Sequence, residues 1–163
     1  MRKIQRFLFA GLLCPGLVFG LPGCSALPTG EGSGAPAGET AAAPSPAGGE
    51  RIIGHGEEVN LADHLVKGKT VIFDFFSEYC PPCRRISPLL SQLDEKRADI
   101  VVVKVDINRK GITGIDWGSP VAKQYGLQGI PHFKIYSPDG KLAQEGDDAY
   151  NRVVELLQGE GLR

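Results

Sequence analysis

Apolar residues gather in short blocks after residue 50, and the spacing of these blocks predicts alternating strands and helices. Two of them, Thr70–Phe76 and Ile100–Asp106, are rich in β-branched and aromatic residues, a composition typical of strands buried on both faces. Between them we expect a helix from Pro81 to about Arg97, because proline suits a first helical turn, with a kink at Pro88. One face of that helix is apolar: Ile86, Leu89, Leu90 and Leu93.

The remaining blocks complete an α/β pattern. Ser119–Tyr125 is expected to form a short helix, and Phe133–Tyr136 and Lys141–Glu145 to form a hairpin around a Ser-Pro-Asp-Gly turn. A last helix is expected to be capped by Asp147 or Asp148. The order βαβαββα predicts a mixed β-sheet with helices on both faces.

The N-terminus has the pattern of an export signal. Residues 1–6 carry three basic side chains and no acid, and residues 7–20 are apolar. A membrane-spanning helix is the alternative, but it needs about 20 apolar residues. It fits less well because Pro15, Gly16 and Gly20 interrupt the apolar run.

The segment Leu21-Pro22-Gly23-Cys24 resembles the bacterial lipoprotein box. The resemblance implies a signal peptide over residues 1–23 and lipidation of Cys24. It also implies a lipid-anchored protein whose domain faces the periplasm or extracytoplasmic space. An ordinary signal peptide with a chance cysteine is the alternative.

Residues 24–50 are predicted to be a disordered linker after the lipidation site. Of residues 25–50, all but Leu27 are Ala, Gly, Pro, Ser, Thr or Glu. Such a composition buries too little apolar surface to offset the entropy of ordering. The folded domain is therefore expected to span residues 51–163.

The charge balance argues against a nucleic-acid partner. The whole chain has a formal net charge of -1. From Cys24 onward it carries 15 basic and 19 acidic side chains, a net charge of -4. A binder of nucleic acid needs a basic surface instead.

The chemistry is expected at Cys80-Pro81-Pro82-Cys83, which follows a buried strand and opens a helix. The N-terminal end of a helix stabilises an anion, so Cys80 gains thiolate character. Cys83 lies one helical turn further on, within disulfide reach. Cys80 is thus the expected nucleophile toward a substrate disulfide, and Cys83 the cysteine that resolves the mixed disulfide.

The segment Phe73–Cys83 resembles the active-site segment of the thioredoxin family, and the resemblance extends over nearly all of residues 51–163. It implies the thioredoxin fold. Asp74 matches a buried acid of the family, Pro88 a helix proline, and Lys104 a lysine that pairs with the acid. Gly129-Ile130-Pro131 matches a loop with a cis-proline, and Gly146 matches a late glycine.

The resemblance also implies roles. Asp74 would accept the proton of Cys83, with Lys104 as its partner; the alternatives are an outward-facing residue near a strand end and a lysine at a sheet edge. The backbone beside Pro131 would pair with a bound substrate strand. The implied substrate-binding residues surround the cysteines: Tyr79, Pro81, Pro82, Ile130, Pro131, His132 and Gly146.

Four features depart from the thioredoxin pattern. Tyr79 replaces a usual tryptophan, and Pro81 replaces glycine, which removes an amide donor close to the sulfur. His132 follows the cis-proline position, where it could stabilise the Cys80 thiolate or merely line the groove. The loop 108–120 is longer than the pattern needs, and its Trp117 could contact a partner or cover the core.

The sequence therefore predicts a thiol–disulfide oxidoreductase that reduces protein disulfides, with no cofactor beyond its cysteine pair. Its expected partners are protein disulfide substrates and a membrane or periplasmic electron donor, and we expect a monomer. A thiol oxidase or isomerase is the main alternative. A metal-binding module is disfavoured because one CxxC supplies only two ligands, and a non-catalytic lipoprotein is disfavoured by the intact cysteine pair.

Overall fold

The computed structural model describes residues 49–163, and five strands within them form one mixed sheet. The predicted signal peptide, Cys24 and all of the predicted linker except Gly49 and Glu50 lie outside the described residues. The strands lie in the order β1-β3-β2-β4-β5. Their bounds are β1 Ile52–Ile53, β2 Thr70–Phe76, β3 Ile100–Asp106, β4 His132–Tyr136 and β5 Leu142–Glu145. β1, β2 and β3 run parallel, and β4 and β5 add an antiparallel edge.

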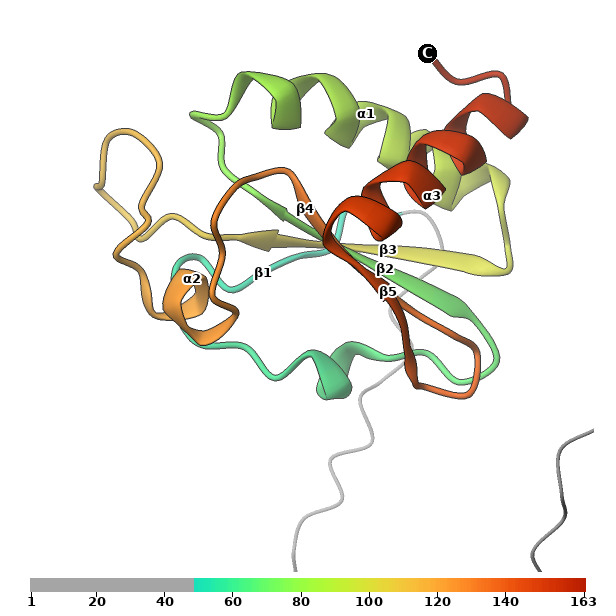
Figure 1. Ribbon diagram of the computed structural model, residues 1–163, viewed down its shortest axis with the longest axis horizontal. Coiled ribbons are helices and arrows are strands. Elements are labelled where there is room, and N and C mark those ends of the chain that lie inside the picture. Colours follow the sequence, from blue (N-terminus) through green and yellow to red (C-terminus); the bar gives the residue numbers. More distant parts are fainter. Residues whose placement is uncertain (1–48) are drawn as a thin grey trace, which may run out of the picture. The chain divides into compact units, whose positions relative to one another are not determined.

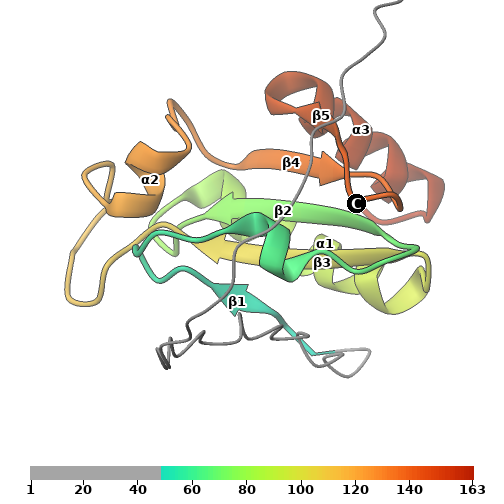
Figure 2. The ribbon, with the colours of Figure 1, turned by 90° about the horizontal axis from the view of Figure 1, so that it is seen from below.

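Helices cover both faces of this sheet (Figures 1 and 2). Helices α1 (Pro81–Lys96) and α3 (Gly146–Gly159) lie on one face. Helix α2 (Pro120–Gln124) and the 3₁₀ helix η1 (Leu61–His64) lie on the other. The prediction of a thioredoxin fold, a mixed sheet between two helical layers, is confirmed.

Strand alternation divides the interior into two cores, because successive side chains point to opposite faces of a sheet. One core joins the odd-numbered residues of β2 and β3 to η1 and α2: Val71, Phe73, Phe75, Val103, Val105, Leu61 and Val121. The other joins the even-numbered residues to α1 and α3: Ile72, Val102, Ile86, Leu90, Leu93, Val153 and Leu157. Asp74 and Lys104 have even numbers and therefore belong to the face under α1.

The element bounds agree with the predicted ones to within a residue or two, with two exceptions. β1 and η1 were not predicted. Helix α3 begins at Gly146, before both predicted caps, and its N-cap residue Glu145 makes no side-chain capping hydrogen bond. Asp147 and Asp148 lie in the first turn instead, where negative charge favours the helix dipole.

Among residues 49–163, no helix combines the length and the apolar character needed to cross a bilayer.

Candidate active site

Cys80 and Cys83 form a disulfide at the N-terminal end of α1, with their Cα atoms 5.2 Å apart. Cys80 is the N-cap residue of the helix and Cys83 its third residue. Both cysteines are buried, with 1% and 0% of their surfaces exposed. Ser77 holds the turn before them, since its carbonyl accepts from Cys80 N–H and its hydroxyl from Tyr79 N–H.

The start of α1 offers the sulfur of Cys80 a single close amide. The N–H of Cys83 donates to Cys80 Sγ at 3.2 Å. Pro81 and Pro82 have no N–H, so this amide is the first that the helix provides. The helix terminus thus stabilises a Cys80 thiolate through one N–H together with the helix dipole.

The loop before β4 faces the disulfide. The carbonyl oxygen of Ile130 lies 3.5 Å from Cys80 Sγ. The Ile130–Pro131 peptide bond is cis, as the resemblance implies. Ile130 and Pro131 are both half-buried, so this loop presents backbone beside the cysteine pair.

Asp74 is fully buried in the centre of β2, on the face covered by α1. Its Oδ2 accepts a hydrogen bond of 2.9 Å from the hydroxyl of Ser87. Its Oδ1 has no hydrogen-bond partner among residues 49–163. Burial raises the pKa of Asp74 to about 7, although the Ser87 hydrogen bond and the charge of Lys104 both act to lower it.

Ser87 relates this acid to the cysteine pair. Residues four apart in a helix lie on the same face, so Ser87 is one turn below Cys83 on the buried side of α1. Because Ser87 contacts Asp74 directly, the carboxyl lies under the helical turn that begins with Cys83. That is a suitable position for a group that exchanges a proton with the buried cysteine.

Lys104 is the neighbour of Asp74 in the pairing of β2 with β3. Its side chain is 7% exposed, and its ammonium group forms an ion pair with the carboxylate of Glu50. Toward Asp74 it acts as a nearby positive charge. The predicted pair is therefore adjacent, but the ammonium is bonded to an acid that the sequence did not indicate.

The comparison with known families agrees with this geometry. The family model described as Thioredoxin matches residues 55–158, well over half of the chain. The chain belongs to the thioredoxin family.

Individual thioredoxins are related to the chain at moderate identity. The F-type chloroplastic thioredoxin of Spinacia oleracea is 29% identical over 114 residues, which cover 67% of this chain and 56% of that protein. The F-type chloroplastic thioredoxin of Pisum sativum is 36% identical over 77 residues, covering 47% of this chain and 38% of that protein. The chain thus spans little more than half the length of these relatives, or less.

Solved structures of thioredoxins are also similar to the chain. The crystal structure of thioredoxin F from spinach chloroplast, in its long form, has 24% sequence identity and a TM-score of 0.46, covering 69% of this chain and 87% of that one.

His132 follows the cis-proline in the chain and is half-buried on the face of the sheet opposite Asp74. Its ring stands edge-on to Phe75, and its Nε2 is 3.4 Å from Glu145 Oε1 without the alignment of a hydrogen bond. Burial lowers the pKa of His132 despite the charge of Glu145. This favours the neutral imidazole, and with it the groove-lining role over the thiolate-stabilising one. Gly146 is a neighbour, since a Cβ there would lie 4.0 Å from the His132 ring.

Exposed apolar side chains occur in the segments that follow β2 and β3, whose carboxyl ends lie at one edge of the sheet. Tyr79 is 40% exposed, and Pro81 and Pro82 are exposed as well. Trp117 is 43% exposed, which argues against the alternative that it covers the core. Tyr79, Pro81 and Pro82 thus offer exposed apolar surface next to Cys80 in the chain.

Two residues that the sequence did not indicate contact the predicted site: Ser87 bonds to Asp74, and Glu50 to Lys104. Ser87 lies on a helical face that the sequence indicated as apolar, although its position four residues after Cys83 places it on the same side of the helix as that cysteine. Nothing in the sequence pointed to Glu50, because it ends a segment with the composition of a linker. Within residues 49–163, no three His, Cys, Asp or Glu side chains are grouped to hold a metal ion.

Proposed function

We propose that this thioredoxin-family protein is a thiol–disulfide oxidoreductase that reduces disulfides in protein clients through Cys80 and Cys83. The observation that carries the proposal is the arrangement around the disulfide. It places the cysteine pair at a helix N-terminus and beside a backbone carbonyl of the cis-proline loop, and a buried acid lies under the same helical turn.

In the reducing direction, the Cys80 thiolate attacks one sulfur of the client disulfide, whose S–S bond breaks and releases a client thiolate. Cys83 gives its proton to Asp74 and attacks the sulfur of Cys80. The second client thiolate leaves, and the protein holds the Cys80–Cys83 disulfide. Two electrons have moved to the client, so an external dithiol donor must return two electrons before the next cycle.

Asp74 suits the proton step because its pKa of about 7 lies close to neutral pH. A group with such a pKa can both accept and release a proton under ordinary conditions. The proton that Cys83 loses before its attack therefore has a nearby acceptor in the interior of the protein.

The reducing direction is favoured over the oxidising one by the poor supply of amide donors at Cys80. Stabilising the thiolate stabilises the reduced form and makes a dithiol pair more oxidising. With proline at residues 81 and 82, only the Cys83 N–H contributes. A reduction potential near the value of thioredoxin, about −270 mV, supports a reductase, and one near −120 mV, on the order of the strongest protein oxidants, overturns it in favour of an oxidase.

We further propose that the protein works outside the cytoplasm, anchored through a lipid on Cys24. The motif Leu21-Pro22-Gly23-Cys24 and the basic, then apolar, segment before it support this proposal. In cells fed a labelled fatty acid, the wild type should be labelled and membrane-bound, and Cys24→Ser should lose both properties. Retention of the label by Cys24→Ser contradicts the anchor.

The catalytic proposal is tested by trapping. In cells, Cys83→Ala keeps the nucleophile and lacks the resolving thiol, so it should accumulate mixed disulfides with clients that dissolve on reduction. Cys80→Ser is the matched control and should trap none. In vitro, the wild type should accelerate the reduction of insulin by dithiothreitol, and neither variant should do so. Equal trapping by both variants, or an unaccelerated insulin reaction, contradicts the proposal.

A further inference from the structure

Lys104 lies between the buried acid of the site and the protein surface. Its backbone is paired with that of Asp74 across β2 and β3, and both side chains occupy the face under α1. The lysine is 6% exposed overall, so its charge is held in a poorly solvated place. A buried ammonium group requires a counter-ion, and two carboxylates are in position to serve: Asp74 and Glu50.

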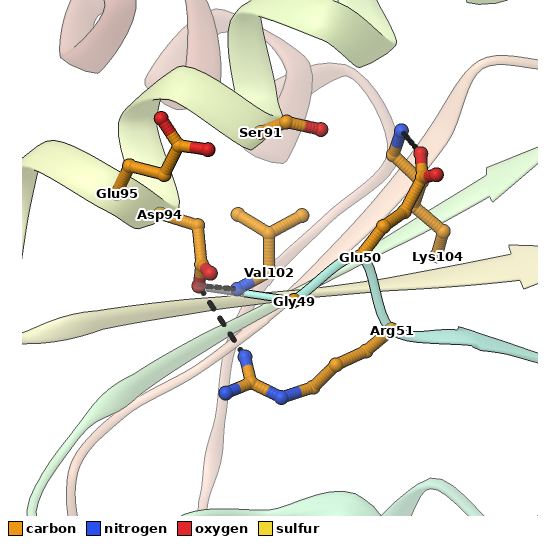
Figure 3. A pocket seen from close by; sticks show the side chains of 8 residues that line it. All are labelled: Gly49, Glu50, Arg51, Ser91, Asp94, Glu95, Val102 and Lys104. Carbon is orange, nitrogen blue, oxygen red and sulfur yellow. Dashed lines mark hydrogen bonds and ion pairs between the residues drawn. The ribbon is translucent and has the colours of Figure 1, made fainter. Parts of the chain in front are cut away.

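The ammonium is paired with Glu50. In Figure 3 the Lys104 side chain extends toward Glu50, and the dashed line marks their ion pair. Glu50 lies two residues before β1, and its side chain is 54% exposed. The pair borders a cavity of about 30 Å³, which is enough for one water molecule. The other polar side chains around this cavity are Arg51, Ser91, Asp94 and Glu95.

Two of these other charged groups are directed toward each other. Asp94 lies 3.5 Å from Arg51 Nη1, and it also accepts from the backbone N–H of Val102 at 2.8 Å. Figure 3 draws both contacts on the side of the cavity away from Lys104. Glu95 lines the cavity from α1 without a drawn contact to the lysine.

Asp74 itself meets few polar groups. From α1 it receives the Ser87 hydrogen bond, with Cys83 one turn away; from β3 it meets Lys104, and from β4 its register partner is the apolar Phe133. One carboxylate oxygen stays without a partner among the described residues. If the ammonium were bonded to that oxygen, the carboxylate would be held in its ionised form and would be a poor proton acceptor.

We propose that Glu50 is a positioning residue for Asp74: by binding the ammonium group of Lys104, it keeps that group from pairing with Asp74 and leaves the buried carboxyl free to exchange a proton. The role in turnover rests on the proposed function, but the electrostatic arrangement does not. Glu50 and Asp74 compete for one cation, and removing Glu50 releases the cation to Asp74. The loss of a nearby negative charge and the release of Lys104 both lower the pKa of Asp74.

The test measures the titration of Asp74 in the oxidised full-length protein, by ¹³C NMR of its carboxyl carbon. Glu50→Gln should move the midpoint to lower pH, by about one pH unit if the ammonium reaches the carboxylate. Glu95→Gln is the matched control, since it removes an equal charge from the same cavity without touching Lys104. It should leave the midpoint close to that of the wild type.

Two further variants separate action through Lys104 from a general charge effect. Lys104→Met should raise the midpoint of Asp74. In the Lys104→Met background, Glu50→Gln should have little further effect, because the group that it releases is absent. An unchanged or raised midpoint in Glu50→Gln, an equal effect of Glu95→Gln, or an undiminished effect in the Lys104→Met background each overturns the proposal.

The kinetic consequence is measured separately. In insulin reduction, the acidic limb of the pH–rate profile should move to lower pH in Glu50→Gln and stay in place in Glu95→Gln. The NMR titration involves neither client nor turnover, so a failure of the proposed activity leaves its result intact. Conversely, normal activity with an unmoved midpoint and an unmoved acidic limb overturns the role of Glu50 alone.

Discussion

Two buried aspartates of this domain have opposite protonation behaviour. Asp116, in the loop after β3, is 6% exposed and accepts from the Arg109 guanidinium at 2.7 and 3.1 Å. That hydrogen-bonded pair holds the pKa of Asp116 below its ordinary value. Asp74 is fully buried, receives one hydroxyl hydrogen bond, and has a pKa raised to about 7.

The difference shows that the hydrogen-bond and charge partners, rather than exposure alone, decide what a shielded carboxyl does. At Asp116 a guanidinium fork satisfies both oxygens and orders a long loop, together with the hydrogen bond from Asn108 to Gly114. At Asp74 the cost of burial is left uncompensated on one oxygen. The first arrangement stabilises structure, and the second keeps a proton exchangeable.

The largest effect is expected from Asp74→Asn. Because the native pKa is raised from 3.8 to about 7, the native state retains a proton that the unfolded chain loses. Ionisation of Asp74 therefore lowers the free energy of unfolding as pH rises from about 4 to about 7, by about 4 kcal/mol in total. The amide of the variant does not titrate. Chemical denaturation at several pH values should therefore show that the free energy of unfolding no longer falls between about pH 4 and pH 7 through Asp74.

The same variant should slow catalysis. Loss of a proton acceptor typically costs about 10²-fold in rate or more, so insulin reduction by Asp74→Asn at pH 7 should fall by that order. Glu95→Asn is a suitable control, being an exposed acid on α1 away from the disulfide. A wild-type rate together with wild-type pH dependence of stability would show that Asp74 does not titrate as described.

The mirror-image experiment is Asp116→Asn. Here the native pKa is lowered, so the carboxylate contributes stability that is present above the unfolded pKa near 4 and is lost as the pH falls. The variant should be less stable than the wild type at pH 7, and the gap should narrow toward pH 3. Thermal unfolding at both pH values measures this, and a gap that widens in acid contradicts it.

Ser87→Ala sharpens the contrast from the side of Asp74. The hydroxyl stabilises the ionised carboxylate, so its loss should raise the pKa of Asp74 further. The stability cost should be about 1 kcal/mol where Asp74 is ionised and smaller where it is protonated. Denaturation at pH 5 and pH 9 tests this. Ser91→Ala, one turn along α1, is the control, and it should change the free energy of unfolding by the same amount at pH 5 and at pH 9.

The smallest change is expected from Arg109→Lys. The charge next to Asp116 remains but the two-pronged geometry is lost, so the pKa of Asp116 should move part of the way back to its ordinary value. Carboxyl ¹³C NMR should register this movement and leave the midpoint of Asp74 unchanged. A coupled movement of both midpoints would contradict the independence of the two sites.

Much of the fold could be predicted because strong local signals coincide with tertiary structure. The β-branched blocks of β2 and β3 are buried on both faces, as their composition indicates. β1 could not be predicted, because two isoleucines carry no periodicity and depend on pairing with β3. The start of α3 was misplaced because Asp147 and Asp148 favour a helix terminus equally as caps or as first-turn residues.

The site could be predicted where its residues are close together in the sequence, and could not be predicted where a contact joins distant segments. Cys80, Cys83 and Asp74 lie within ten residues and share one strand–helix unit, so their spacing in the sequence predicts that they lie close together. The partner of Lys104 is 54 residues away and precedes an edge strand. Only the parallel pairing of β1 with β3 brings Glu50 beside the lysine.

This last contact affects where the domain can safely be cut. Composition places the boundary of the folded part at Arg51, and a protein started there would retain every helix and strand of the fold. It would nevertheless lack Glu50, so the ammonium of Lys104 would lose its ion-pair partner while Asp74 remained its neighbour in the sheet. A shortened protein of this kind should therefore be regarded as an electrostatic variant of the site, and its redox behaviour compared with that of a chain that begins several residues earlier.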